Sequence, residues 1–227
     1  MIPIRKNLCP ESRYDLKCPY TRTPSRIVVH NTGNDAPAAN EIAYMVNRPE
    51  QVSFHFAVDD KEAVQGLPLH RNAWASGDSH GKGNMEGIHV EICYSLSGGD
   101  KFVKAEQNAA QLIADLLRQY GWGIDKVTKH QDYDGKYCPH RTLDFGWQRF
   151  LNMVRNALKE EEEEMRYNKI SEMPDWAQKT IKKLCEKKYL SGDGGKKDEN
   201  GCPADLDLSM DMIRLFVIND RAGLYGA

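Results

Sequence analysis

The chain has 227 residues, of which 40% are hydrophobic and 28% charged, and its formal net charge is −2. These proportions are typical of a soluble globular protein and indicate one medium-sized domain with a smaller one beside it. Because the charge is nearly balanced and no apolar run reaches about 18 residues, we expect neither nucleic-acid binding nor membrane insertion. The N-terminal residues lack a signal-peptide pattern, so we expect synthesis in the cytoplasm.

Short apolar runs predict strands at 26–30, 54–58 and 87–94, with a further extended segment at 63–67. Apolar residues recur at helical spacing over 36–46, 104–120 and 143–158, and Gly121 is expected to end the second of these helices. This alternation of strands and helices predicts an α/β fold, with a single mixed β-sheet flanked by α-helices.

The composition of the chain changes after the acidic run KEEEEE at 159–164. Two more helices are predicted beyond it, at 176–189 and 210–221, and Ser209 is the expected N-cap of the second. We therefore predict a main domain over 1–159, an acidic linker over 160–168, and a small, mostly helical domain over 169–227.

Candidate metal ligands lie in two places in the first domain. His30 closes a buried strand, and His130 and Cys138 share a loop in which Pro139 restricts the cysteine. Two imidazoles and a thiolate are a ligand set that suits Zn²⁺, and a catalytic zinc site keeps its fourth position open. A structural zinc site, with His55 or His140 as a fourth ligand, is the alternative interpretation.

Glu91 is the candidate general base. Alternation along the strand at 87–94 separates it from the apolar residues, and a glutamate in such a strand needs a partner. A water molecule activated by zinc would be such a partner, and the cation of Lys136 would stabilise the charge that forms on an amide oxygen. We expect Asp132 to orient His130. The sequence His89-Val90-Glu91 also matches the H-x-E motif of zinc nucleobase deaminases, but the second thiolate of that class is missing.

These features together resemble the type 2 N-acetylmuramoyl-L-alanine amidase family, which is related to peptidoglycan recognition proteins and phage endolysins. The resemblance extends over residues 2–158. It is carried by the strand ending Val28-Val29-His30-Asn31-Thr32, the segment 53–59, the Ala73-Trp74 step, the strand around Glu91, and H-x5-K-x-C from His130 to Cys138.

The resemblance implies Zn²⁺ bound by His30, His130 and Cys138, with Glu91 and Lys136 catalytic. It implies a substrate in bacterial peptidoglycan, namely the amide between N-acetylmuramic acid and L-alanine. Candidate substrate contacts are Asn31, Phe54 and Trp74, although some relatives have tyrosine in place of Phe54 and many have histidine in place of Ala75.

Without a signal peptide, such an enzyme is expected to reach the wall only after release through a permeabilised membrane. The second domain resembles the C-terminal modules of clostridial phage lysins, which implies wall binding or homodimerisation. A non-catalytic peptidoglycan recognition module is the alternative, although members that do not cut usually lack the cysteine ligand.

Overall fold

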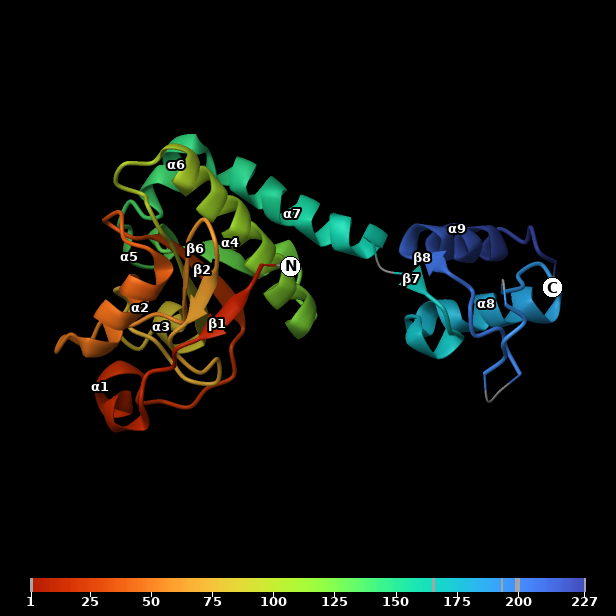
Figure 1. Cartoon of the computed structure of the whole chain (residues 1–227), viewed down its shortest axis with the longest axis horizontal. Coiled ribbons are helices and arrows are strands. Elements are labelled where there is room, and N and C mark those ends of the chain that lie inside the picture. Colours follow the sequence, from red (N-terminus) through yellow and green to blue (C-terminus); the bar gives the residue numbers. More distant parts are fainter. Residues whose placement is uncertain (1, 165, 193, 199–200, 227) are drawn as a thin grey trace. The chain divides into compact units, whose positions relative to one another are not determined.

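The computed structural model describes residues 2–164, 166–192, 194–198 and 201–226, without the side chains of 160–164. It divides the chain into two compact units, Met1–Leu158 and Lys159–Ala227 (Figure 1). Within the described ranges, none of the helices has the length and apolar composition needed to cross a membrane.

The first unit is built on a six-stranded mixed sheet with the order β1-β4-β3-β5-β2-β6. The bounds of its strands are β1 Ile4–Lys6, β2 Arg26–Asn31, β3 Phe56–Val58, β4 Ala63–Gln65, β5 Gly87–Ile92 and β6 Val127–Lys129. In this sheet β3 and β4 pair in antiparallel fashion, whereas β3, β5, β2 and β6 run parallel to one another. The carboxyl ends of these four strands therefore meet at one edge, where ligands of open α/β sheets usually bind.

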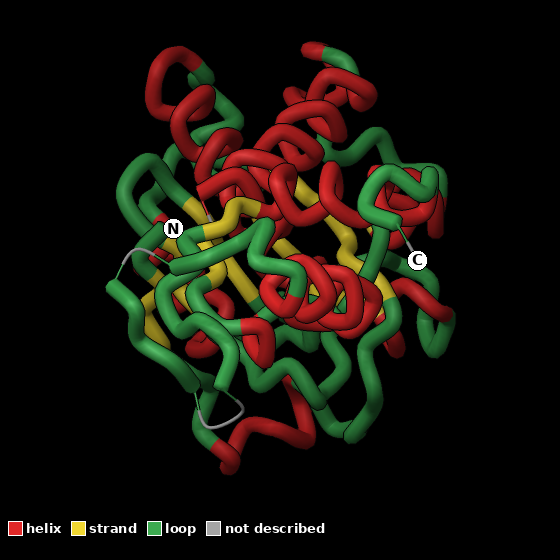
Figure 2. The backbone as a smooth tube through the Cα atoms, turned by 90° about the vertical axis from the view of Figure 1, so that its right-hand side faces the viewer, coloured by secondary structure: helices red, strands yellow, loops and turns green. Residues whose placement is uncertain are grey.

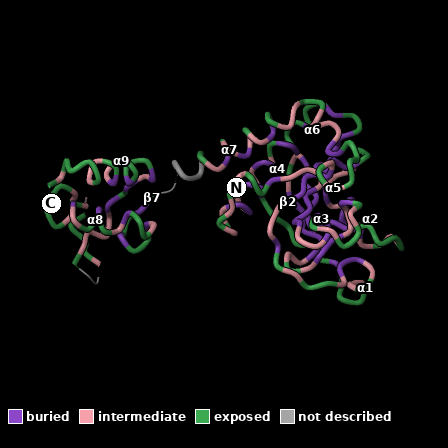
Figure 3. The backbone as a smooth tube through the Cα atoms, turned by 180° about the vertical axis from the view of Figure 1, so that it is seen from behind, coloured by how far each residue is buried: buried purple, intermediate pink, exposed green. Residues whose placement is uncertain are grey.

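The central strands β2 and β5 are buried along most of their length, because helices pack against the sheet. Ile27, Val29, Ile88 and Val90 are all 0% exposed. Figure 2 draws the strands in yellow and the helices in red, and Figure 3 shows buried backbone gathered around β2. Near-continuous apolar runs are what parallel strands covered in this way require.

Two helices pack against the sheet strands β3 and β4: α2 (Ala38–Asn47) and α4 (Gly99–Tyr120), which also contacts β5. The buried residues of α4 include Phe102, Ala109, Ile113 and Leu117, which form one stripe at helical spacing. Gly121 ends the helix in the left-handed conformation, as predicted. The short helices of this unit are α1 Tyr14–Lys17, α3 Lys82–Glu86, α5 Gln131–Asp134 and α6 His140–Phe145.

The single helix predicted at 143–158 is wrong. Gly146 adopts a φ of +103° and separates α6 from α7 (Trp147–Glu164). A right-handed helix cannot pass through that conformation, so the chain turns there. Residues 160–164, predicted as part of a linker, continue the backbone helix of α7.

The second unit has its own small core. Helices α8 (Asp175–Glu186) and α9 (Met210–Arg221) pack together beside a two-stranded antiparallel pair, β7 (Arg166–Tyr167) and β8 (Leu208–Ser209). The core includes side chains from both helices and from the strands. The hydroxyl of Ser209 accepts a hydrogen bond from the N–H of Met212 at 3.2 Å, so the predicted N-cap is confirmed.

Candidate metal centre

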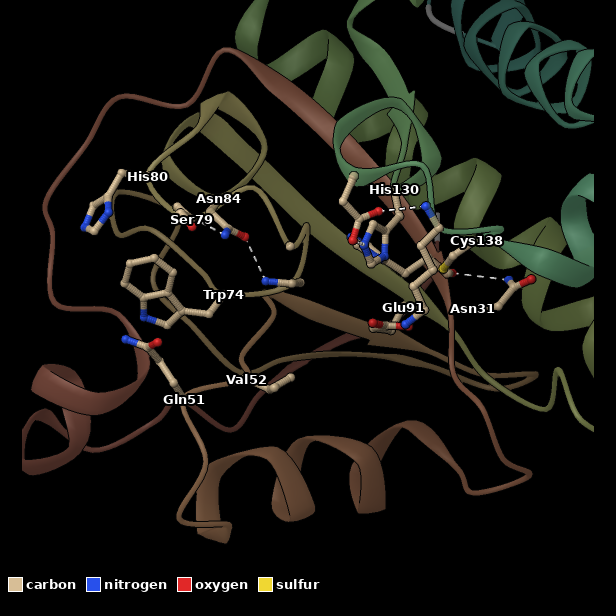
Figure 4. A pocket seen from close by; sticks show the side chains of 15 residues that line it. Asn31, Gln51, Val52, Trp74, Ser79, His80, Asn84, Glu91, His130 and Cys138 are labelled. Carbon is tan, nitrogen blue, oxygen red and sulfur yellow. Dashed lines mark hydrogen bonds and ion pairs between the residues drawn. The ribbon is translucent and has the colours of Figure 1, made fainter.

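The strand ends bring together the side chains that the sequence separates by a hundred residues. His30 lies on β2 directly beside Glu91 on β5, because these two residues are register partners. His130 follows β6, and its backbone N–H donates to the carbonyl of Val29 at 3.2 Å. All three residues consequently lie at the carboxyl edge of the sheet, and Figure 4 shows Glu91 and His130 there.

The predicted ligands form a compact group. The candidate ligand atoms of His30, His130 and Cys138 all lie within 4.8 Å of one another, and the two Nδ1 atoms are 3.1 Å apart. Their side chains are buried, with 1%, 5% and 5% exposed. Among the described residues, no other group of histidine, cysteine and carboxylate side chains has this arrangement. Two imidazole nitrogens and one sulfur fit the preferences of Zn²⁺.

Neither of the histidines considered as a fourth ligand belongs to this group. The Nδ1 atom of His55 accepts a hydrogen bond from the backbone N–H of His89 at 3.0 Å, and its Nε2 atom lies 3.0 Å from the carbonyl of Arg71. His140 begins α6. Three protein ligands facing a pocket are the pattern of a catalytic rather than a structural zinc site.

Each histidine ligand has a hydrogen-bond partner at Nε2, the ring nitrogen that is not directed at the other histidine ligand. Nε2 of His130 is 3.1 Å from the carboxylate of Asp134, and Nε2 of His30 is 2.9 Å from Nδ1 of His89. The prediction that Asp132 orients His130 is wrong, because Asp132 accepts from the N–H of Lys129 and pairs with its ammonium group. Asp134 has the role because four residues along a helical turn bring it back beside His130.

Burial dominates the electrostatics of the site. It lowers the pKa of His30 well below its usual value, with neighbouring His89, His130 and Lys136 adding to the effect. It raises the pKa of the Cys138 thiol to about 12, with the charge of Glu91 adding to the effect. A divalent cation among these donors would compensate for their desolvation and hold the sulfur as a thiolate.

Glu91 faces the same space. Its Oε2 atom is buried and has no hydrogen-bond partner among the residues that the structure describes. Burial raises its pKa to about 8; the negative charge of Glu41 adds to this rise and the cation of Lys136 opposes it. A carboxylate whose pKa lies close to neutrality can both accept and return a proton.

A pocket of about 610 Å³ extends from this group, and its lining includes Glu91 and Lys136. In Figure 4 His130, Cys138 and Glu91 lie at one end and Trp74 at the other. The ring of Trp74 has edge contacts with Tyr20 and His80, at centroid distances of 6.1 and 5.5 Å. Sequence reasoning did not identify several further lining residues, which are Gln51, Val52, Ser79, His80 and Asn84.

The three predicted substrate contacts have different positions. Trp74 and Asn31 line the pocket, whereas Phe54 is not among the lining residues and is only 7% exposed in the core. The amide of Asn31 also accepts from the backbone N–H groups of Arg141 and Thr142 at 3.0 and 3.2 Å, so it anchors the start of α6. The Gly- and Ser-rich stretch at 75–84 was the available signal for the unpredicted residues, since such loops often carry binding groups.

Comparison with known proteins gives a consistent result. The family model described as N-acetylmuramoyl-L-alanine amidase matches residues 20–141. Two proteins of Bacillus subtilis named N-acetylmuramoyl-L-alanine amidase, XlyB and CwlA, are 54% and 52% identical to the chain, and each match covers 70% of it. The matched regions span 50% and 59% of those proteins' own lengths.

Solved structures match the first unit in the same way. The structure of PlyL has a TM-score of 0.66 at 55% identity, covering 67% of this chain and 97% of that one. The catalytic domain of XlyA has a TM-score of 0.62 at 37% identity, covering 67% of this chain and 99% of that one. The mixed sheet flanked by helices is therefore shared with these proteins.

Proposed function

The chain belongs to the N-acetylmuramoyl-L-alanine amidase family, and we propose that its first unit is a zinc-dependent enzyme acting on bacterial peptidoglycan. The bond cleaved would be the amide between N-acetylmuramic acid and L-alanine. The observation that carries the proposal is the placement of Glu91 beside the His30, His130 and Cys138 group, in one pocket with Lys136.

Zinc held by these three side chains would supply Lewis acidity, which polarises the amide carbonyl and makes a water molecule more acidic. The unpartnered Oε2 atom of Glu91 accepts the proton of the attacking water. The protonated carboxyl then donates that proton to the leaving nitrogen of L-alanine. The ammonium group of Lys136 stabilises the negative charge that develops on the carbonyl oxygen.

The test is digestion of purified cell walls by the full chain. We expect new N-terminal alanine without new reducing sugar, loss of this product after chelation, and recovery when zinc is restored. Undiminished cleavage by protein verified to be free of metal would overturn the zinc assignment. Binding to walls without any cleavage would favour the recognition-module alternative.

We also propose that the second unit has a separate role, either attachment to the wall or association between two copies of the chain. It has its own core, and α9 presents Met212, Leu215 and Ile218 with 39%, 56% and 62% of each residue exposed. Wall-binding and sedimentation measurements on the full chain and on a chain ending at Leu158 distinguish the two roles. A shortened chain that behaves like the full one in both measurements would refute both.

A further inference from the structure

His89, the first residue of the H-x-E match, does not belong to the metal group. Its side chain is 0% exposed, and its Nδ1 atom is 2.9 Å from Nε2 of His30. We propose that His89 is a positioning residue: together with the carbonyl of Gly83, it fixes the tautomer of His30 that turns a bare Nδ1 toward the zinc. The proposal rests on the proposed zinc site.

The carbonyl of Gly83 determines the direction of the hydrogen bonds that link Gly83, His89 and His30. Nε2 of His89 is 3.0 Å from the carbonyl oxygen of Gly83, which can only accept. Nε2 of a neutral His89 must therefore carry the proton, and its Nδ1 is left as an acceptor. That acceptor requires a donor at Nε2 of His30. With its proton on Nε2, His30 has its free lone pair on Nδ1, 3.1 Å from Nδ1 of His130.

The surrounding structure holds His89 in this orientation. The backbone N–H of His89 donates to Nδ1 of His55 at 3.0 Å, and the two rings are nearly parallel, at 8° and a centroid distance of 5.7 Å. Gly87 leaves room for the bond to Gly83, because a Cβ atom there would lie 2.5 Å from the Gly83 oxygen and 3.1 Å from Nε2 of His89. The contact to Gly83 thus depends on a glycine, whereas His55 bonds the backbone of His89.

The hydrogen bonds that orient His30 do not require the metal, because their final acceptor, the carbonyl of Gly83, is part of the polypeptide backbone. Asp134 orients His130 in the same way. Its carboxylate lies beside Nε2 of His130, and Nδ1 of His130 faces Nδ1 of His30. Outer partners of this kind raise the affinity of a site because the ligands need no reorientation when the metal binds. His89, which is not among the residues that line the pocket, therefore supports the metal site through His30.

The test compares zinc affinity, measured by competition with a chromophoric chelator, in full-length His89→Leu and His89→Asn variants. Leucine removes the acceptor, whereas the asparagine oxygen replaces it near the position of Nδ1. We expect leucine to weaken binding about 10- to 100-fold and asparagine to restore most of the loss. The visible spectrum of the cobalt-substituted protein should change for leucine and return toward that of the wild type for asparagine.

His55→Asn is the matched control, because it disturbs the same buried stack and keeps an acceptor for the N–H of His89 without touching His30. We expect it to change the stability of the zinc-free protein. Its zinc affinity should stay within about threefold of the wild type, which is less than the roughly 10-fold loss expected when an outer partner is removed. Equal weakening by the His55 and His89→Leu variants, or no rescue by asparagine, would overturn the positioning role.

A measurement on the unaltered protein keeps the proposal testable if the variants do not fold. Long-range proton–nitrogen correlation of the zinc-free wild type should show both His89 and His30 protonated at Nε2. A proton at Nδ1 of His89 would overturn the proposal even if the enzyme cleaves walls as proposed. Failure of the wild type to bind zinc would instead count against the proposed function, so the two failures are distinguishable.

Discussion

Replacing Glu91 by glutamine should reduce activity and increase stability at the same time. The change is nearly isosteric and removes the group proposed to move the proton. General acid–base catalysis contributes about 10²- to 10⁴-fold, so kcat should fall by that factor, which corresponds to about 3–5 kcal/mol of barrier. The zinc content of the variant should be measured, so that loss of the metal is not mistaken for loss of the base.

The stability effect follows from the pKa of Glu91, which is raised from 4.5 to about 8, primarily by burial. Between these two values the folded protein retains a proton that the unfolded chain has released, so stability falls as the pH rises. The full difference corresponds to about 5 kcal/mol. Because Glu91 borders a solvent-accessible pocket, we expect the zinc-free variant to gain only about 1–3 kcal/mol at pH 8 and much less at pH 5.

Denaturant unfolding of the zinc-free proteins at both pH values, together with wall digestion, tests both parts. Glu41→Gln is a matched control: Glu41 is also a buried carboxylate whose pKa burial raises, but it does not line the pocket. It should alter stability and retain most of the activity. Wild-type turnover by the Glu91 variant, or a stability difference that does not depend on pH, would refute this reasoning.

Three further predictions concern the metal and the two units. Cys138→Ser should reduce zinc affinity measured by chelator competition and abolish cleavage, because it replaces the only thiolate of the group by a weaker zinc ligand. Asp134→Ala should weaken zinc binding about 10- to 100-fold, whereas Asp132→Ala should not; equal effects on measured affinity would contradict the assignment of the His130 contact. A chain ending at Leu158 should still release N-terminal alanine from soluble muropeptides, because the first unit has its own core; aggregation or complete inactivity would contradict this.

The strands and helices that sequence analysis identified are those with buried apolar residues, including the three-residue strands β3 and β4. Strands β2 and β5 and helix α4 are buried over most of their length, so their hydrophobic residues are regularly spaced. Strands β1 and β6 have only three residues each, and all of β1 is exposed. These two strands form because they pair with neighbouring strands, and a pattern within a few residues of sequence cannot show that pairing. The omission of β6 matters, because it carries the chain to His130.

The proposed ligands were recognisable because their chemistry is rare. Histidine and cysteine close to a proline in one loop indicate a metal site even before the partner strand is known. Orienting groups have no such signal, since aspartates at both 132 and 134 could reach His130 from sequence spacing alone. The actual choice depends on the helical turn of α5 and on the backbone N–H of Lys129, which engages Asp132.

The segment 75–84, a loop that leads into α3, shows why the pocket wall could not be derived from a residue pattern. Its shape is made by side chains bonded to its own backbone: the carboxylate of Asp78 accepts from the N–H groups of Gly83 and Asn84 at 2.7 and 3.0 Å. The amide oxygen of Asn84 in turn accepts from the N–H groups of Ala75 and Ser76 at 2.9 and 2.8 Å. These bonds place the carbonyl of Gly83 where His89 meets it. One folded loop therefore forms a wall of the pocket and, through His89, supports the ligand His30, so changes in that loop should affect metal affinity as well as substrate binding.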